Sequence, residues 1–171
     1  MFIVVFLLIT LVAIVTHLVL DKRARNPKRV LELILLYIFV VQVGVGGVWA
    51  WMGHAFMADK VATLIGWPTG SPFQYEIAVC DLAWGVCGIL CIWFRNGFWL
   101  ATGIGNSVFL LGCAYGHIRS LQVTGNTAPY NAGPVLWLAD LLMPVLLLVL
   151  LFIYRRLVRR AGGLPLRADP A

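Results

Sequence analysis

The sequence predicts an all-α integral membrane protein with five transmembrane helices, and three observations lead to that prediction. Of the 171 residues, 61% are hydrophobic and only 12% are charged, whereas a soluble domain is typically about 25% charged. Five stretches are long and apolar enough to cross about 30 Å of hydrocarbon, which takes about 20 helical residues. Because lipid offers no hydrogen-bond partner to a bare backbone, each stretch is expected to be a helix rather than an open strand.

The first expected helix covers residues 2–20, FIVVFLLITLVAIVTHLVL. It differs from a cleaved signal peptide, which has a basic segment before the apolar run and a small-residue cleavage site after it. Here the positive charges follow the apolar run, in DKRARNPKR. These features predict a retained membrane helix whose N-terminus lies outside.

The other four expected helices are joined by short polar turns and by two longer connections. The helices cover residues 30–52, 75–94, 97–118 and 135–154. The longer connections, 53–73 and 119–134, contain the turn-forming runs GWPTGSP and TGNTAPYNAGP. Both are expected on the outer side, either as a structured lid over the bundle or as flexible linkers. Residues 1–154 are thus expected to form a single transmembrane domain, followed by a basic cytoplasmic tail at 155–171.

The distribution of lysine and arginine predicts the orientation. If five helices alternate, eleven of the thirteen basic residues fall on one side: Lys22, Arg23, Arg25, Lys28, Arg29, Arg95, Arg155, Arg156, Arg159, Arg160 and Arg167. Lys60 and Arg119 fall on the other side. Basic loops stay in the cytoplasm, so the C-terminus is expected to be cytoplasmic, in a multi-pass protein of the cytoplasmic (inner) membrane. The net charge of +6 indicates topology and attraction to anionic lipid. The lipid bilayer is therefore an expected partner, and nucleic acid is not.

Ionisable residues are costly in hydrocarbon, so they tend to face the bundle interior or water and to serve a function. Glu32 and His17 lie near the cytoplasmic helix ends, where pairing with the nearby basic loop accounts for them. Five others come from four helices and lie at similar depth in the outer half of the membrane: Glu76, His117, Asp140, His54 and Asp81. The sequence therefore predicts a polar pocket at the extracytoplasmic end, for which Glu76, His117 and Asp140 are the first candidates.

Helical periodicity gives the fourth membrane helix a polar stripe, made of His117, Cys113, Asn106 and Thr102. The segment GCAYGH also contains Gly112 and Gly116, a G-x-x-x-G pair typical of close helix contacts. On the third membrane helix, Glu76 shares a face with Cys80. Asp81 lies about 140° away from Glu76, on the face of Gly85 and Gly88.

Three interpretations of this pocket remain open. Glu76, His117 and Asp140, with His54 as a fourth, suit a divalent metal such as zinc, iron or manganese, although no helix has a spacing such as H-x-x-H or E-x-x-H. Cys80 and Cys113 could form a redox pair, or they pack as small apolar side chains. Alternatively, the polar groups only fix helix register.

Other residue patterns exclude several classes of protein. The seven tryptophans are expected mostly in interfacial aromatic belts, and only Trp84 is placed to line a pocket. The sequence contains no P-loop, nucleotide fingerprint, haem C-x-x-C-H motif or Ser–His–Asp pattern.

Two resemblances add to this reading. The run GWPTGSPFQYEIAVCDLAWGVCGIL, with its Gly-x-Pro loop, early helix glutamate and Gly-rich continuation, resembles DoxX-like membrane proteins. That likeness implies a four-helix bundle over residues 30–154, with the first helix as an addition, and a link to sulfur or quinone redox chemistry or to accessory roles in membrane complexes. The segments GCAYGH, NTAPYNAG and WLAD are similar to a small bacterial membrane family of unknown function, across most of residues 66–145. This second likeness implies signature positions at Glu76, His117, Asn126, Asn131, Gly133 and Asp140.

The leading functional hypothesis is a small integral membrane binding or accessory protein with a carboxylate and histidine pocket at its outer end. Asn126 and Asn131 are expected to brace the lid through local bonds to the backbone. The alternative is a membrane oxidoreductase, in which a divalent metal or the Cys80–Cys113 pair passes electrons to quinone. A small-molecule or ion transporter is third, because no internal repeat is visible. A membrane-complex partner, a homo-oligomer and an enzymatic activity all stay open.

Overall fold

The computed structural model describes residues 2–21 and 26–160, and every regular element in those residues is a helix. Lys22, Arg23 and Arg25 of the basic loop and residues 161–171 of the predicted tail lie outside the described residues. Five helices are long and apolar enough to cross a membrane: Phe2–Leu20, Pro27–Phe56, Phe73–Leu90, Gly97–Thr124 and Val135–Arg160. The prediction of a multi-pass helical membrane protein is confirmed at this level.

The first two membrane-crossing helices begin where the sequence gives clear signals. Helix α1, Phe2–Leu20, has the predicted bounds. The second combines α2, Pro27–Tyr37, with the π-helix η1, Ile38–Val45, and with α3, Gly46–Phe56. It begins at Pro27 rather than 30, because the Asn26 side chain accepts a hydrogen bond from the Lys28 backbone and proline suits the first helical position.

The later helices differ from their predicted bounds. Helix α5 covers Phe73–Leu90 rather than residues 75–94, so it begins two residues earlier and ends four residues earlier than expected. Helix α6 covers Gly97–Thr124 and ends at Gly125, with φ 68°, rather than at residue 118. The π-helix η2, Val135–Leu142, continues directly into α8, Met143–Arg160. Four arginines expected in a tail are therefore helical, and the buried side chain of Val158 keeps this last part of α8 packed on the bundle.

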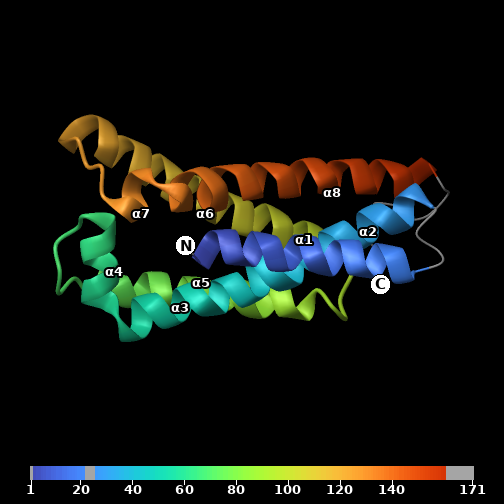
Figure 1. Ribbon diagram of the computed structural model, residues 1–171, viewed down its shortest axis with the longest axis horizontal. Coiled ribbons are helices and arrows are strands. Elements are labelled where there is room, and N and C mark those ends of the chain that lie inside the picture. Colours follow the sequence, from blue (N-terminus) through green and yellow to red (C-terminus); the bar gives the residue numbers. More distant parts are fainter. Residues whose placement is uncertain (1, 22–25, 161–171) are drawn as a thin grey trace, which may run out of the picture.

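Helices α3 and α5 run side by side, as do α6 and α8, and in the view of Figure 1 α1 lies between α8 and the α3–α5 pair. Glycines let α3 and α5 approach closely: a Cβ atom on Gly47 would lie 2.8 Å from the Asp81 carbonyl oxygen, and one on Gly88 would collide with Gly44. The face of Gly85 and Gly88 is thus the inner face of α5.

The expected close contact at Gly112 and Gly116 is wrong within the described chain. No atom lies within 4 Å of a Cβ built on either glycine, and both residues are exposed. Helix α6 instead turns its opposite side inward, the side that carries His117. Spacing alone indicates that two glycines share a face, but it does not indicate which face packs.

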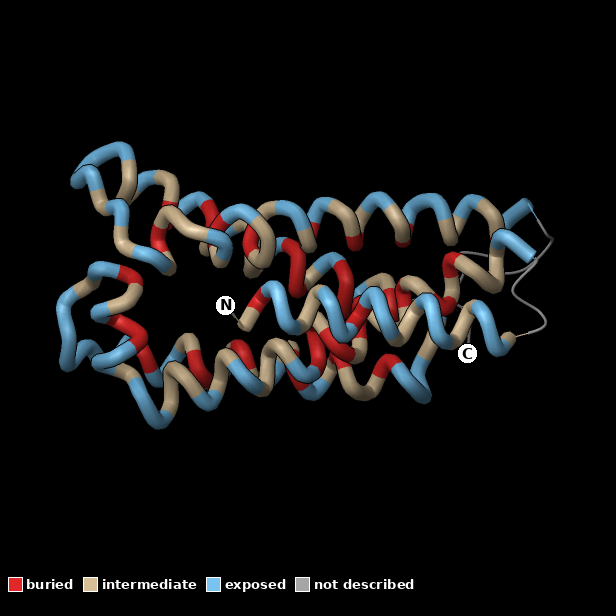
Figure 2. Tube along the Cα trace, viewed as in Figure 1, coloured by how far each residue is buried: buried red, intermediate tan, exposed pale blue. Residues whose placement is uncertain are grey.

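The apolar core lies in the half of the bundle away from α4 and α7, where buried residues face the interior and exposed ones line the outside (Figure 2). Phe39, Trp99 and Leu147 are almost completely buried there. The Trp99 indole nitrogen donates to the Cys91 carbonyl oxygen at 2.9 Å. Burying this large ring with its N–H hydrogen-bonded holds the C-terminal end of α5 against the first turn of α6.

Helix α1 touches the bundle along one narrow side. In its middle, Gln42 of η1 donates to the Thr10 hydroxyl at 2.7 Å. At its start, the Phe2 ring lies 5.9 Å from the ring of Tyr130. Its other side is apolar and exposed, with Val12 at 62% and Val19 at 78% exposure, as suits contact with lipid.

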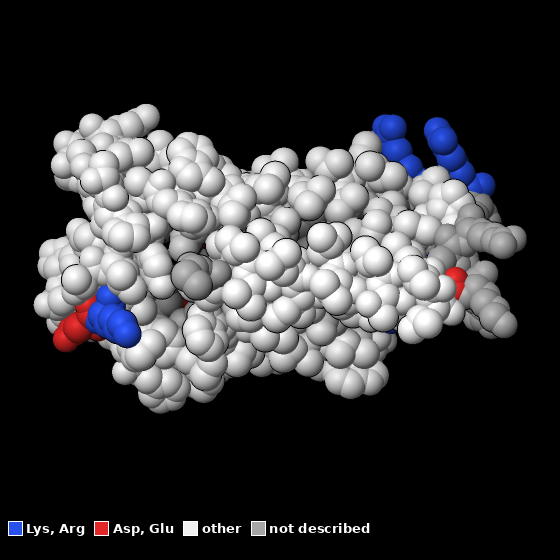
Figure 3. Space-filling model, viewed as in Figure 1, with Lys and Arg blue, Asp and Glu red and all other residues white. Residues whose placement is uncertain are grey.

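The bundle has two chemically different ends. One end, which we call the lid end, holds two short helices, α4, Ala58–Ile65, and α7, Pro129–Ala132, so the long connections are partly helical. The other, which we call the basic end, holds Arg29, Arg95 and the last turns of α8. Charged atoms gather at these two ends, and the long middle of the visible face is almost free of them (Figure 3). Which end faces the cytoplasm stays a prediction.

Candidate functional site

At the lid end, α6 and η2 bring a histidine and an aspartate together inside the bundle. His117 Nε2 lies 3.8 Å from Asp140 Oδ2, and both side chains are more than nine-tenths buried. Asp140 lies on η2, a π-helical stretch that begins just after Pro134. Such stretches occur often at functional sites. The sequence predicted both residues as site candidates, and the structure brings them together.

Asn131 of α7 fixes the orientation of this histidine. Its amide nitrogen donates to two backbone carbonyl oxygens, those of Asn126 at 2.7 Å and His117 at 3.3 Å. Carbonyl oxygens only accept, so the amide can have only one orientation, with its oxygen toward His117 Nδ1 at 3.0 Å. His117 Nδ1 must therefore carry a hydrogen and donate it.

This arrangement determines what lies between His117 and Asp140. If the imidazole is neutral with its hydrogen on Nδ1, the bare lone pair of Nε2 faces the carboxyl group. A buried carboxylate facing a lone pair would be uncompensated and costly. Either a hydrogen on Nε2, which makes an ion pair, or a neutral acid at Asp140 would remove this cost.

An indole ring covers one face of this imidazole. The ring of Trp67 stacks on that of His117, with centroids 5.8 Å apart and 21° between the planes. Trp67 reaches this position because α4 ends at Gly66, which has φ 78° and lies so close to Asn126 that a Cβ would collide with it. The indole thus covers the imidazole on a face that the Asn131 amide does not contact.

Asn126 joins the two connections of the lid end. Its amide nitrogen donates to the Ile65 carbonyl oxygen at 2.9 Å, and its oxygen accepts from the Ala128 backbone at 3.0 Å. Asn126 and Asn131 thus form backbone bonds of the kind expected from the sequence. Of the two alternatives for these connections, the structure shows the structured lid.

Further predicted residues lie near the pair without a hydrogen bond to it. Asp81 of α5 is buried and interacts electrostatically with Asp140. Cys113 of α6 is within electrostatic range of both acids and of Cys80. The other members of the polar stripe, Asn106 and Thr102, are also buried and face the interior.

Two other candidates lie apart from the pair. Glu76 is exposed in the first turn of α5, because the inner face of that helix belongs to Asp81 and the glycines. His54 Nδ1 lies 2.6 Å from the Gln74 amide oxygen, a contact between α3 and α5. Among the described residues, neither forms a hydrogen bond or an ion pair with His117 or Asp140. Glu76 is thus separated from the two residues with which it was grouped.

The expected metal set does not assemble. Within residues 2–21 and 26–160, no group of three or more histidine, cysteine, aspartate or glutamate side chains is placed to hold a metal ion. The physical reason is the orientation of Glu76, since a helix cannot turn Glu76 and Asp81 inward together. All four cysteines are free thiols, Cys80 and Cys113 included.

Trp67 was predicted to lie in an interfacial aromatic belt, but in the structure its ring covers His117. Its position between Gly66 and Pro68, inside a connection rather than at a helix end, was the signal that distinguishes it. Trp84, the expected pocket-lining tryptophan, packs instead against Gly105, and its indole nitrogen is buried without a hydrogen-bond partner.

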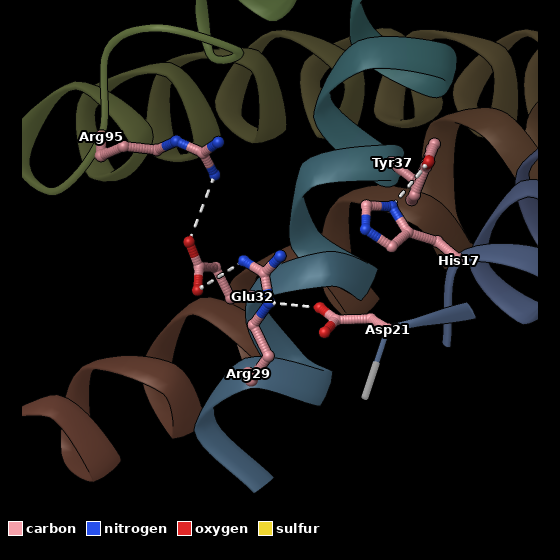
Figure 4. A network of polar contacts seen from close by, with 6 residues as sticks. All are labelled: His17, Asp21, Arg29, Glu32, Tyr37 and Arg95. Carbon is pink, nitrogen blue, oxygen red and sulfur yellow. Dashed lines mark hydrogen bonds and ion pairs between the residues drawn. The ribbon is translucent and has the colours of Figure 1, made fainter. Parts of the chain in front are cut away.

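A second polar network lies at the basic end (Figure 4). Arg29 donates from Nε to Asp21 at 2.9 Å and from Nη1 to Glu32 at 3.3 Å, and Arg95 lies 3.6 Å from the other Glu32 oxygen. His17 Nδ1 lies 3.0 Å from the Tyr37 hydroxyl. Pairing with basic residues thus accounts for Glu32, as the sequence suggested.

Comparison with known proteins gives one match. The model of a protein family described as "Family of unknown function (DUF6790)" matches residues 1–160. No curated protein and no solved structure matches. The segments GCAYGH, NTAPYNAG and WLAD all lie inside the matched range. The likeness to DoxX-like proteins gains no support from the matched family and stays an expectation.

Proposed function

Because the chain belongs to the DUF6790 family, whose function is unknown, we propose its role from its own residues: it is a small integral membrane binding protein. Its ligand site is the His117–Asp140 pair at the lid end. The single observation that supports this proposal is the buried contact between Nε2 and Oδ2 at 3.8 Å. Ionisable groups buried at membrane depth are rare, and their usual explanation is function.

The chemistry of the pair suggests what it binds. An imidazole and a carboxyl group lie 3.8 Å apart, so a ligand between them can be offered both a hydrogen-bond donor and an acceptor. The indole of Trp67 adds a flat apolar surface beside them. Such a combination suits a small ligand with a polar or ionisable group on an apolar body.

The lid supports a binding role over a purely structural one. Asn131 contacts both the ring and the backbone of His117, and its remaining amide hydrogen is donated to the Asn126 carbonyl oxygen of the lid. Helix packing alone does not require a fixed ring orientation. A site that must present one particular nitrogen does require it.

We further propose that the lid end faces outward in the cytoplasmic membrane. Seven described basic residues of the predicted cytoplasmic side are Lys28, Arg29, Arg95, Arg155, Arg156, Arg159 and Arg160, against Lys60 and Arg119 on the other side. The positive-inside rule then places the site on the extracytoplasmic side. An accessory role beside a partner in the membrane, and a DoxX-like arrangement of residues 30–154, belong to the same proposal.

Nuclear magnetic resonance of labelled histidine tests the site directly. The chain has three histidines, so a His17→Gln/His54→Gln variant with ¹⁵N-labelled histidine reports His117 alone. The expected spectrum shows a hydrogen on Nδ1, with a second hydrogen on Nε2 in the charged form. Asp140→Asn should change the Nε2 signal and leave the Nδ1 signal in place.

Ligand binding is measured from the same ¹⁵N resonances of His117. A small-molecule extract of the expression host should shift the Nε2 resonance in the His17→Gln/His54→Gln protein and should fail to do so when Asp140→Asn is added. Ser120→Ala, which alters the lid without touching the pair, is the matched control and should respond normally. A neutral His117 with its hydrogen on Nε2, or a response that survives Asp140→Asn, would refute the proposed site.

A thiol-based oxidoreductase is the second candidate, because Cys80 and Cys113 lie within electrostatic range of each other as free thiols. In the proposed step, two thiols form a disulfide, and their two electrons and two protons reduce a quinone to the quinol. Incubation with a short-chain quinone should lower the free-thiol count by two, and Cys113→Ala should abolish that loss. An unchanged count with excess quinone would remove this candidate.

A further inference from the structure

A groove lies at the basic end between the last turns of α1 and the start of α2. It is lined by Ala13, Thr16, His17, Leu20, Asp21, Arg29 and Tyr37. His17, Asp21, Arg29 and Tyr37 of the groove belong to the network of Figure 4. This groove lies at the opposite end of the bundle from the His117–Asp140 pair and is independent of it.

The apolar part of the groove opens toward the surroundings of the bundle. Ala13 and Leu20 line it, and Leu20 is 74% exposed. Next to them on α1, Val12, Val15 and Val19 are half-exposed or more, with no other part of the described chain over them. From Ala13 to Leu20, α1 rises about 10 Å, which is most of the depth of one leaflet of a core about 30 Å thick. An acyl chain has the polarity and length to lie along this wall.

The polar part of the groove offers mainly hydrogen-bond donors. A guanidinium group has five N–H donors, and the contacts of Arg29 with Asp21 and Glu32 use two of them. A third of the Arg29 side chain remains exposed. The Tyr37 hydroxyl and the His17 ring are hydrogen-bonded to each other, which leaves one O–H or N–H of this pair to donate, and the exposed Thr16 hydroxyl adds another donor. Guanidinium and hydroxyl donors together suit phosphate oxygens.

The charge around the groove selects the kind of headgroup. Lys28 precedes Arg29 on α2, and Arg155, Arg156, Arg159 and Arg160 end α8 on the same end of the bundle. The one acidic residue of the groove wall, Asp21, is already paired with Arg29. Basic clefts between transmembrane helices attract anionic headgroups. A zwitterionic lipid should bind less tightly here, because the groove offers no unpaired acidic side chain to its positive group.

We propose that this groove binds an anionic phospholipid, with its phosphate at Arg29, His17 and Tyr37 and one acyl chain along Ala13 and Leu20. The site differs from general contact with the bilayer in having a specific headgroup contact and a shaped apolar wall. It gives α1, which has few contacts of its own, an additional link to α2 through the bound lipid.

Lipid titration of the purified full-length protein tests the proposal. The protein in mild detergent is titrated with phosphatidylglycerol, with phosphatidylcholine of the same chains, and with inorganic phosphate, and binding is followed by thermal unfolding and native mass spectrometry. Phosphatidylglycerol should bind about fivefold more tightly than phosphatidylcholine, the ratio expected when one basic residue contributes about 1 kcal/mol. Inorganic phosphate alone should have no effect. Equal binding of the two lipids, or an equal effect of phosphate, would overturn the proposal.

Two pairs of variants locate the effect. Ala13→Phe fills the groove and leaves all charges in place, and Val12→Phe adds the same bulk on the exposed side of α1. Arg29→Gln removes the proposed phosphate contact, and Lys60→Gln removes an exposed positive charge on α4, at the opposite end of the bundle. Ala13→Phe and Arg29→Gln should each weaken phosphatidylglycerol binding about fivefold or more, with the controls unchanged.

The Ala13→Phe variant keeps the test valid if Arg29→Gln unfolds. Full phosphatidylglycerol binding in folded Ala13→Phe protein would overturn the proposal. The oligomeric state of the protein should also be the same in wild type and Ala13→Phe. A change from dimer to monomer in the variant would show that a second copy of the chain, and not a lipid, occupies the groove.

Discussion

The two ends of the bundle stabilise their ionisable groups in different ways. At the lid end, His117 and Asp140 are more than nine-tenths buried, and the neutral amide of Asn131 holds the histidine. At the basic end, Arg29, Glu32 and Arg95 keep between a quarter and a third of their side chains exposed, and they pair with each other. The contribution of the buried lid-end residues to stability therefore depends on the positions of their hydrogen-bond partners. The contribution of the basic-end ion pairs depends on solvent and salt.

The largest expected effect comes from removing the amide that holds the histidine. Asn131→Leu loses three hydrogen bonds, which leaves His117 Nδ1 without its acceptor and gives two carbonyl oxygens one donor fewer each. At about 0.6–2 kcal/mol for each bond in a membrane protein, we expect a loss of about 2–4 kcal/mol of stability. Thermal unfolding in detergent measures it.

Gln122→Leu is the control for Asn131→Leu, since Gln122 is exposed on α6 at the same end. It should change stability by less than about 0.5 kcal/mol. If the two variants unfold at the same temperature, Asn131 does not brace the lid.

The second prediction compares two glycines with the same backbone conformation. Gly66 has φ 78° and faces Asn126 closely, whereas Gly70 has φ 77° and open space where a Cβ would be. Alanine at Gly70 should cost about 1 kcal/mol, the penalty of left-handed backbone alone. Gly66→Ala should cost about 2–3 kcal/mol, since it also displaces Asn126. Equal losses in thermal unfolding would show that the contact between Gly66 and Asn126 has no energetic value.

A smaller effect is expected at the basic end, and it should depend on salt. Glu32→Gln weakens the contacts with Arg29 and Arg95, and partly exposed ion pairs contribute about 0.2–1 kcal/mol each. We expect a loss of about 1 kcal/mol at low salt, which shrinks at about 1 M salt, where the Debye length is about 3 Å. Glu76→Gln, an exposed acid at the lid end, should leave stability unchanged at both salt concentrations. Salt-independent destabilisation by Glu32→Gln would contradict the comparison of the two ends.

The smallest expected effect is that of one hydrogen bond between α1 and α2. Tyr37→Phe removes the hydroxyl that lies 3.0 Å from His17 Nδ1. A double-mutant cycle with His17→Phe should give a coupling energy of about 0.5 kcal/mol, near the average for polar contacts between membrane helices. A coupling energy of zero would mean that the two side chains do not interact in the folded protein.

The sequence was sufficient to predict the five helices and part of the site. Apolar length gave the bounds of α1 without error, and the cost of burying charge identified His117, Asp81 and Asp140 before any contact was known. Side-chain chemistry likewise predicted that Asn126 and Asn131 would bond to the backbone of the lid. These inferences succeed because they depend on single residues and their immediate neighbours in sequence.

The rest depends on which helix faces meet, and sequence spacing does not contain that information. Periodicity showed that Glu76 and Asp81 point apart, but only the contact of α5 with Gly44 and Gly47 puts Asp81 inside. The same limit applies to Gly112 and Gly116, which share a face that packs against nothing within the described residues. Trp67 meets His117 across fifty positions of sequence through two connections that fold onto each other.

Helix α1 touches both ends of the molecule and little in between. With 19 residues, it is about 28 Å long, close to the thickness of the hydrocarbon layer. Its Phe2 ring meets Tyr130 beside Asn131, and its last turn meets Tyr37. A transmembrane helix adapts to a thinner bilayer by tilting. Tilting α1 would displace both contacts together, so the dimensions of the host membrane act mechanically on the segment that orients the imidazole.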